Sequence, residues 1–356
     1  MAGVYISYPF CSQKCTYCNF ASGVFPRDLE RRYVEAVQAE LRRTEWPWRP
    51  ETAYLGGGTP SLIDPAAFLD LVPGRPWREA TIEAAPGGIT REKAELWRNA
   101  GINRVSLGVQ SFVRAELART GRRHTADIVA QEVGVLRSAG IESINIDLIA
   151  GLPGQTRQSW KESLDWLERI GAPHASVYML EVDDDSRLGH EIRLGGKRYG
   201  ASDVPSDDEI AEFYEMAVDR LAAMGLARYE ISNFARPGFE SRHNLKYWRR
   251  EPYLGFGADA HSFDGEWRWQ NPESAAEYVE RPGPRERVLA DPIGERFFLG
   301  LRLTEGIEGE WSPFEDAVRR FIQAGLLKSK GGRLSLTPRG VLLSNEVFAE
   351  FVVVAA

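Results

Sequence analysis

Residues 4–20 read VYISYPFCSQKCTYCNF, an apolar stretch that runs into three closely spaced cysteines. The stretch Val4–Tyr8 predicts a short buried strand. Cys11, Cys15 and Cys18 follow it, and the sequence of 356 residues contains no other cysteine. Disulfide scaffolds spread many cysteines along a chain, so three thiols gathered in one short loop indicate a metal centre instead.

The spacing of the cysteines, C-x3-C-x2-C, favours an iron–sulfur cluster over the alternatives. Three thiolates hold three irons of a [4Fe–4S] cluster, which leaves the fourth iron for a ligand other than cysteine. Structural zinc usually takes four ligands in paired knuckles. Here the second pair is missing, and no histidine occurs before His124. Packing alone gives no reason for three buried thiols to gather in one loop.

Short apolar strands alternate with helical patterns through the first half of the chain. Six strands are predicted, at residues 4–8, 53–55, 80–84, 104–108, 143–149 and 175–180. Between them apolar side chains recur at helical spacing, as at Tyr33, Val37 and Leu41. This alternation indicates βαβ units and a parallel sheet, either an open barrel or a doubly wound sheet.

Several polar motifs fall where the predicted strands end. Residues 56–60, GGGTP, follow the second strand, Glu83 and Gln110 close the third and fourth, and Asp147 lies near the end of the fifth. Loops after the strands of such folds carry the chemistry, because helix N-termini and free backbone amides converge there. We therefore expect these residues to meet the cysteines at one rim.

The second half of the chain breaks the alternation. Residues 182–205 predict a surface excursion, and the helix that follows begins with a capping box formed by Ser206 and Glu209. The sequence PGP at 282–284 is typical of a linker. Beyond it, a helical stripe at 314–322 precedes a hairpin around Gly331 and Gly332, a pattern typical of a winged-helix-like α+β module.

The bulk properties exclude several classes of protein. The formal net charge of −7 argues against a nucleic-acid partner, since phosphate binding needs an excess of Lys and Arg, and a DNA-binding regulator is therefore the least favoured function. The sequence has neither a basic region followed by an apolar run nor about 18 consecutive apolar residues. We therefore expect a cytoplasmic protein.

The cysteine motif after the first strand resembles that of the radical S-adenosylmethionine (SAM) superfamily. Motifs along nearly the whole chain resemble its oxygen-independent (anaerobic) coproporphyrinogen III oxidase family, namely GGGTP (56–60), IEAAP (82–86), GVQSF (108–112), GRRH (121–124), NIDLIAGLPGQT (145–156), YEISNFA (229–235) and GADAHS (257–262). The resemblance implies an α/β fold, a partial (β/α)6 TIM-like barrel of the radical SAM type. It divides the chain into the barrel (1–182), a family-specific extension (183–284) and the winged-helix-like module (285–356).

The resemblance also implies a cofactor site. It assigns a [4Fe–4S] cluster to the three cysteines and places SAM on the open iron. The residues carried over as cofactor contacts are Tyr5, Tyr17, Gly57, Gly58, Thr59, Glu83, Gln110, Arg122 and Asp147. Glycines allow the backbone to approach a charged ligand closely, and a carboxylate such as that of Glu83 suits ribose hydroxyls.

Two features separate the branches of this family. Decarboxylating oxidases resemble C-x3-C-x2-C-x-C, whereas Phe20 takes the last of these positions here. Residues 243–248, HNLKYW, resemble the H-N-x-x-Y-W signature of HemW-type heme chaperones. Because imidazole is a common axial ligand of heme iron, the resemblance implies His243 as the heme ligand, beside Tyr247 and Trp248. A structural histidine is the alternative, and His261 is a second candidate.

The resemblance therefore implies a heme chaperone that binds heme and passes it to an acceptor protein, supported or regulated by the cluster and SAM. The expected partners are heme, an acceptor, an electron donor and, by peripheral association, a membrane; catalytic turnover is left open. The alternative is a radical SAM oxidative decarboxylase, an oxygen-independent coproporphyrinogen III oxidase of porphyrin biosynthesis. Three positions depart from the family pattern. Ser7 replaces a frequent histidine, which argues against decarboxylation, Ala85 replaces an asparagine and Asp259 a glycine.

Overall fold

The structure is a computed structural model that describes residues 2–352. Its main sheet has twelve strands in the order β12-β11-β10-β9-β1-β2-β3-β4-β5-β6-β8-β7. The six strands in its middle run parallel, as the sequence predicts. They are β1 (Gly3–Tyr8), β2 (Thr52–Gly57), β3 (Glu79–Ala84), β4 (Arg104–Gln110), β5 (Ser143–Ala150) and β6 (His174–Met179).

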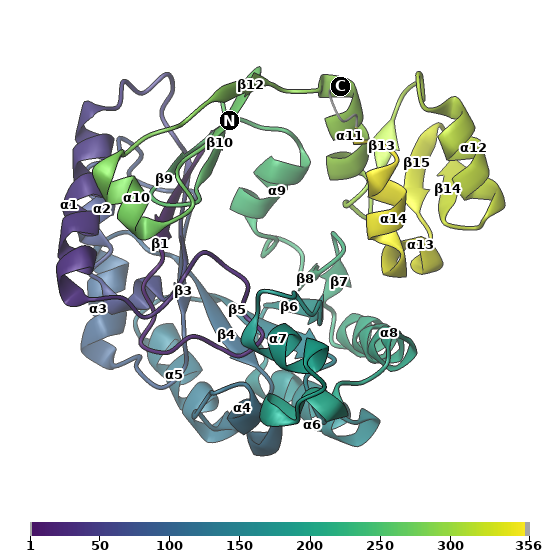
Figure 1. The fold of residues 1–356 in the computed structure, drawn as a ribbon, viewed down its shortest axis with the longest axis horizontal. Coiled ribbons are helices and arrows are strands. Elements are labelled where there is room, and N and C mark those ends of the chain that lie inside the picture. Colours follow the sequence, from purple (N-terminus) through teal and green to yellow (C-terminus); the bar gives the residue numbers. More distant parts are fainter. Residues whose placement is uncertain (1, 353–356) are drawn as a thin grey trace.

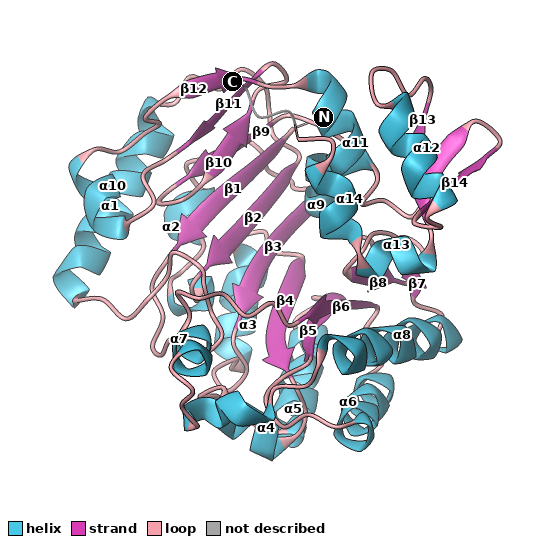
Figure 2. Ribbon diagram, turned by 45° about the vertical axis from the view of Figure 1, so that its right-hand side comes forward, coloured by secondary structure: helices cyan, strands magenta, loops and turns pink. Residues whose placement is uncertain are grey.

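Helices cover the outer face of this curved sheet (Figures 1 and 2). They are α1 (Arg27–Arg43), α2 (Ala66–Leu69), α3 (Arg91–Asn99), α4 (Arg114–Arg119), α5 (Ala126–Ser138), α6 (Arg157–Ile170) and α8 (Asp207–Ala223), with a 3-10 turn η1 (Pro60–Leu62). Tyr33, Val37 and Leu41 are buried on α1, as their spacing predicts. The capping box of Ser206 and Glu209 at the start of α8 is also confirmed. The α/β fold of the partial barrel is therefore as expected.

The segment after β6 adds strands to both edges of the sheet. β7 (Ala227–Arg228) and β8 (Asn233–Ala235) extend it beyond β6. β9 (Tyr253–Phe256), β10 (His261–Phe263), β11 (Trp267–Gln270) and β12 (Arg287–Leu289) extend it beyond β1. The connections contain α7 (Arg187–Arg193), η2 (Arg198–Asp203), α9 (Arg242–Trp248) and α10 (Ala275–Glu280). The strands of residues 227–289 thus form one sheet with the barrel, so β12 of this sheet lies beyond residue 284, and the domain boundaries stay predictions.

The C-terminal module stands beside the barrel (Figure 1). It consists of α11 (Pro292–Gly300), β13 (Ile307–Glu308), α12 (Glu315–Gln323), β14 (Leu327–Lys330), β15 (Arg333–Leu336), α13 (Pro338–Leu342) and α14 (Ser344–Ala349). The predicted hairpin is β14 and β15, and Gly331 and Gly332 at its turn have φ of 61° and 78°, which favour glycine. The small sheet with its helices is the expected winged-helix-like arrangement.

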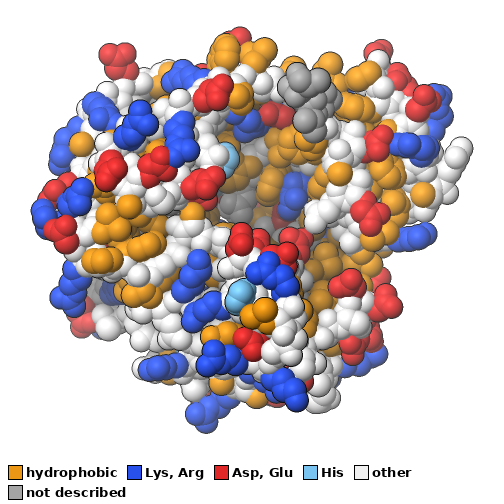
Figure 3. Space-filling model, in the orientation of Figure 1, with side chains coloured by type: hydrophobic (Ala, Val, Ile, Leu, Met, Phe, Trp, Pro, Cys, Tyr) orange, Lys and Arg blue, Asp and Glu red, His pale blue; other side chains and the backbone are white. Residues whose placement is uncertain are grey.

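Side-chain contacts join the module to the rest of the chain. The Arg302 guanidinium lies 4.3 Å from the ring centroid of Trp248, which ends α9. Arg250 pairs with the buried Glu295 at 2.7 Å. Between the barrel and the module the surface is hollowed (Figure 3).

Among the described residues, no helix is both long and apolar enough to cross a membrane.

Candidate cofactor site

The three cysteines lie in the loop that leaves the carboxyl end of β1. Their thiols are free and partly exposed. The backbone fixes the loop, because the Cys11 amide donates to Gly23 O at 2.8 Å and the Gly23 amide donates to Pro9 O at 2.9 Å. The Cys18 amide donates a hydrogen bond to Cys15 O at 3.4 Å, which closes a turn between the second and third cysteines. The loop therefore presents all three thiols from one short stretch of chain.

The surface excursion predicted after β6 covers this loop from outside. The Leu188 amide at the start of α7 donates to Thr16 O at 2.8 Å. The Asn19 side chain donates to Asp183 Oδ2 at 3.2 Å. The Arg187 guanidinium donates to Lys14 O. Segments far apart in the sequence thus hold the cysteine loop against the barrel.

The glycine motif after β2 packs directly against the cysteine loop. The Gly58 amide donates to Tyr8 O at 2.8 Å and the Thr59 amide to Phe10 O at 2.9 Å. A Cβ atom on Gly58 would lie 2.8 Å from Phe10 O and 2.9 Å from Cys11 Sγ. Glycine is needed here because the two loops approach too closely for a side chain.

Glu83 lies at the end of β3 beside this glycine motif. Its Oε1 accepts from the Tyr54 hydroxyl at 2.8 Å, and its Oε2 accepts from the Gly57 amide at 3.2 Å. Burial, above all, and the nearby Asp147 carboxyl raise the pKa of Glu83 to about 7, although the hydrogen bonds from Tyr54 and Gly57 lower it. The ring of Tyr5 stacks on that of Tyr54 at 6.0 Å.

Asp147 lies on β5, two strands away from Glu83 in the sheet, and two neighbouring side chains hold it by hydrogen bonds. Ser106 donates to its Oδ2 at 3.0 Å, and Asn145 donates to its Oδ1 at 2.7 Å. Burial raises the pKa of the Asp147 carboxyl, which these hydrogen bonds partly offset. Two half-buried carboxyl groups with raised pKa values therefore face the inside of the barrel.

Gln110 and Arg122 complete the rim on the side of β4. The backbone of Gln110 has φ of 70°, rare for a residue with a side chain, and the register with β5 shifts between Gly108 and Gln110. The Arg122 guanidinium donates to Gly108 O at 2.7 Å. Burial lowers the pKa of Arg122, but Tyr17 and Cys15 beside it raise that pKa overall.

These residues fit a four-iron cluster better than a single metal ion. Among residues 2–352, no three His, Cys, Asp or Glu side chains gather closely enough to hold one ion. A cluster differs, because each thiolate binds a separate iron and the three sulfurs surround a cube. The close contact of Gly58 with Cys11 Sγ leaves no room for a side chain between the two loops, so the glycine backbone itself borders the thiols.

The sequence motifs assign no role to Tyr54, Ser106 or Asn145, although these side chains hold the two carboxyl groups. A signal for Ser106 and Asn145 does exist. Both alternate with apolar residues in strands whose other side chains are buried, such as Leu107 and Ile146. In a sheet covered by helices on one face, polar residues at every second position mark the face that lines a site.

His243 lies in α9, away from the cysteines, and has no exposed surface. Its Nδ1 lies 2.9 Å from the Thr52 hydroxyl, and its Nε2 lies 2.8 Å from the Tyr247 hydroxyl. Thr52 begins β2, so α9 lies against the amino ends of the strands, opposite the cysteine loop. Heme ligation by His243 therefore requires one of these hydrogen bonds to break and α9 to move. Trp248 is already stacked on Arg302.

Asp259, where the family pattern has glycine, adopts a backbone conformation that favours glycine. Its φ is 59°, a conformation that glycine adopts freely and that aspartate adopts at a cost. The Gln270 side chain donates to Asp259 Oδ1 at 2.7 Å and stabilises this turn.

Ser7, a second departure from the family pattern, is buried at the end of β1, where its carbonyl accepts from the Tyr33 hydroxyl at 2.8 Å.

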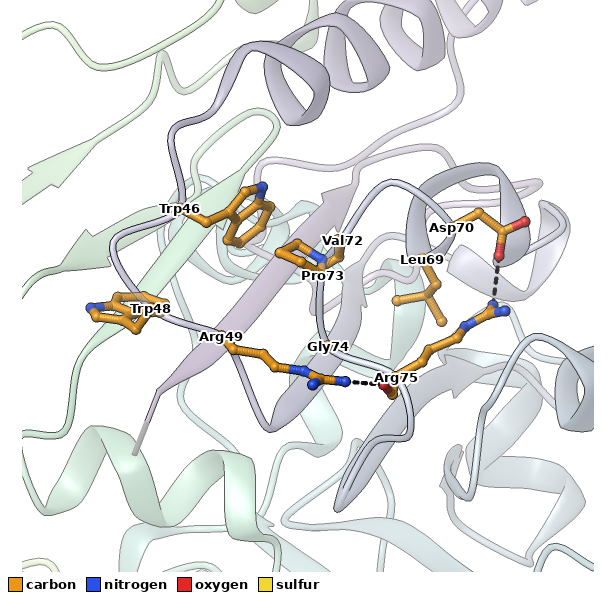
Figure 4. A pocket seen from close by; sticks show the side chains of 9 residues that line it. All are labelled: Trp46, Trp48, Arg49, Leu69, Asp70, Val72, Pro73, Gly74 and Arg75. Atoms are coloured by element: carbon orange, nitrogen blue, oxygen red, sulfur yellow. Dashed lines mark hydrogen bonds and ion pairs between the residues drawn. The ribbon is translucent and has the colours of Figure 1, made fainter.

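A groove of about 800 Å³ lies on the outside of the barrel (Figure 4). Trp46, Trp48 and Arg49 line one wall, and Asp70 and Arg75, which pair at 2.7 Å, line another. These residues belong to the connections before β2 and β3, at the edge of the sheet opposite the cysteines. The groove contains none of the predicted site residues.

Comparison with known proteins agrees with this geometry. Residues 5–167 match the radical SAM superfamily, and residues 289–343 match the HemN C-terminal domain. The chain is 34% identical to the heme chaperone HemW of Lactococcus lactis, over 98% of this chain and 96% of that protein. It is 32% identical to HemW of Bacillus subtilis, over 99% of each.

Among solved structures, the coproporphyrinogen III oxidase HemN of Escherichia coli superimposes with a TM-score of 0.82. The match covers 98% of this chain and 89% of that one, at 21% sequence identity. At that identity, the likeness shows a shared fold of barrel and C-terminal module.

Proposed function

Since the chain belongs to the radical SAM superfamily, and within it to the family of the heme chaperones HemW, we propose that it binds heme and transfers it to an acceptor protein. The observation that carries this proposal is the similarity to HemW proteins over nearly the whole length of both chains. A match confined to the barrel would support only the superfamily. Here the extension with α9 and the C-terminal module are included.

The cysteine loop supports the same choice. Cys11, Cys15 and Cys18 are the three ligands for the [4Fe–4S] cluster that the superfamily implies, and Phe20 takes the place of a fourth cysteine. The Phe20 side chain is 67% exposed beside this loop. When bound, the cluster and SAM supply one-electron chemistry. In this proposal they support or regulate heme transfer.

The chain's own residues have defined parts in holding SAM. Gly57, Gly58 and Thr59 offer a backbone that a charged ligand can approach closely. Glu83, with its pKa near 7, accepts hydrogen bonds from amino or hydroxyl groups when it is ionised. Asp147 and Gln110 line the same rim, and Arg122 with Tyr17 borders it beside Cys15. The ring of Tyr5 stacks on that of Tyr54, whose hydroxyl donates to Glu83.

The remaining partners belong to the same proposal. They are an acceptor protein, an electron donor that reduces the cluster, and peripheral contact with a membrane. We place the protein in the cytoplasm and assign it no nucleic-acid partner, in keeping with its formal net charge of −7.

The test compares two substrates under the same conditions. Protein whose cluster has been reconstituted without oxygen is given SAM, a reductant and coproporphyrinogen III, and a parallel sample is given hemin. We expect a stoichiometric shift of the hemin Soret band and no decarboxylated porphyrinogen. Turnover of coproporphyrinogen III to protoporphyrinogen IX with consumption of SAM would show an oxidase and overturn the chaperone.

A further inference from the structure

The five histidines of the chain differ in whether a ligand can reach them. His124, His174 and His243 are buried. His190 is exposed on α7, where its Nδ1 lies 3.1 Å from Arg193. His261 is exposed, and within residues 2–352 neither of its ring nitrogens makes a hydrogen bond. Histidine is visible at the edge of the central hollow in Figure 3.

His174 and His243 share one arrangement, which sets them apart from His261. Nδ1 of His174 lies 2.6 Å from Asn145, and its Nε2 lies 2.8 Å from the Tyr229 hydroxyl. Both ring nitrogens of His243 are paired in the same way. A buried imidazole with two partners stabilises the fold, and coordination of a metal would leave a buried hydroxyl without its partner.

His261 begins β10, on the side of that strand that also carries Phe263. Phe263 pairs with Tyr253, whose ring lies 4.6 Å from that of Tyr247 on α9. His261 is therefore on the same side of the sheet as α9. Val288 of β12 is on this side as well and is 54% exposed, which adds apolar surface.

The surroundings of His261 favour its neutral imidazole. Neighbouring protein atoms displace part of the water around this exposed side chain and lower the pKa of His261, and Arg268 lowers it further, while Asp259 opposes them. Iron binds the neutral imidazole through a free nitrogen lone pair. His261 meets this requirement, because neither ring nitrogen has a hydrogen-bond partner among the described residues.

We propose that His261, rather than His243, is the axial ligand of the heme iron, and that His243 anchors α9 against β2. This assignment rests on the proposed heme-binding function and sharpens it. Heme ligation and the anchoring of α9 are then the roles of two different histidines on the same side of the sheet. His243 fixes the helix that borders the hollow, and His261 projects an unpaired nitrogen from the strand.

The test compares three variants of the cluster-loaded protein, His261→Gly, His243→Gln and the matched control His190→Ala. Each is titrated with hemin without oxygen and examined by absorption and by electron paramagnetic resonance, which report imidazole ligation. Thermal unfolding shows whether each variant is folded. Free imidazole is then added to every hemin complex, because it can replace a side chain that was removed from the iron.

We expect His261→Gly to lose the histidine-ligated spectrum and to regain it with free imidazole. His190→Ala, and His243→Gln where it is folded, should keep the spectrum. A histidine-ligated spectrum in His261→Gly before imidazole is added would overturn the assignment, and so would hemin binding to the unmodified protein without histidine ligation. Failure of the unmodified protein to bind hemin at all would instead overturn the proposed function.

Discussion

The hydroxyl of Tyr54 lies 2.8 Å from Glu83 Oε1, and the ring of the same tyrosine lies 5.3 Å from that of His243. One side chain of β2 therefore touches both the candidate cofactor site at the carboxyl ends of the strands and α9 at their amino ends. The two regions that carry the sequence motifs are in contact through the inside of the barrel.

Glu83 should make the stability of the protein depend on pH. Its pKa is raised to about 7, so the folded protein retains a proton that the unfolded chain releases near pH 4.5. The resulting stability is fully present below pH 4.5 and is lost as the pH rises through about 7. Between pH 5 and 8 the unmodified protein should lose up to roughly 3 kcal/mol relative to Glu83→Gln.

Thermal unfolding of both proteins at several pH values, without SAM, measures this difference. The unmodified protein should show the steeper decline toward high pH. Curves that run parallel from pH 5 to 8 would show that Glu83 titrates in the folded protein as it does in the unfolded chain.

Glu79 should be essential for the placement of α9. Its carboxylate accepts from the amides of Arg242 and His243, both at 2.9 Å, and from the Ser241 hydroxyl at 3.3 Å. Glu79→Ala leaves these buried donors without an acceptor and should lower the free energy of unfolding by about 2–4 kcal/mol. Denaturant titration measures the change. The exposed Glu280→Ala is the control, and an equal loss in both variants would contradict the anchoring role.

Each of the three cysteines should be required for the cluster. Single substitutions Cys11→Ala, Cys15→Ala and Cys18→Ala should reduce reconstituted iron from about four atoms per chain to nearly none, because two thiolates hold the cube poorly. Iron and sulfide analysis, with the visible absorption, measures this. The exposed Ser12→Ala in the same loop should keep its iron. A cysteine variant with a full complement of iron would exclude that residue as a ligand.

Asp259 allows the backbone cost of one departure from the family to be measured. Asp259→Ala and Asp259→Gly both lose the hydrogen bond from Gln270, but only glycine adopts the φ of 59° freely. The glycine variant should therefore be more stable than the alanine variant by about 1 kcal/mol. Equal stability of the two variants in denaturant would show that the turn relaxes when the side chain is shortened.

The parallel half of the fold follows from the sequence because its signals are local. Each strand is a short apolar run, each helix has its own periodicity, and the motifs fall where the strands end. Glu83 and Asp147 could thus be placed at one rim before any contact was known. The glycine motif at 56–60 also has a local cause, since the backbone approaches the cysteine loop too closely for a side chain.

The parts that the sequence does not predict depend on contacts between distant segments. His243 meets Thr52 across 191 positions, and nothing in the HNLKYW motif distinguishes a buried anchor from a heme ligand. The same residue types suit both roles. The pairing of β9 with β1, which joins the extension to the barrel, is equally distant in sequence. The exposure of His261 likewise becomes visible only once β10 is in place.

Equilibrium titration of the anaerobically reconstituted protein with hemin distinguishes specific heme binding from adsorption. We expect a Soret change that saturates at one heme per chain. A Soret change that grows without saturation as hemin is added, as in nonspecific adsorption, would contradict it.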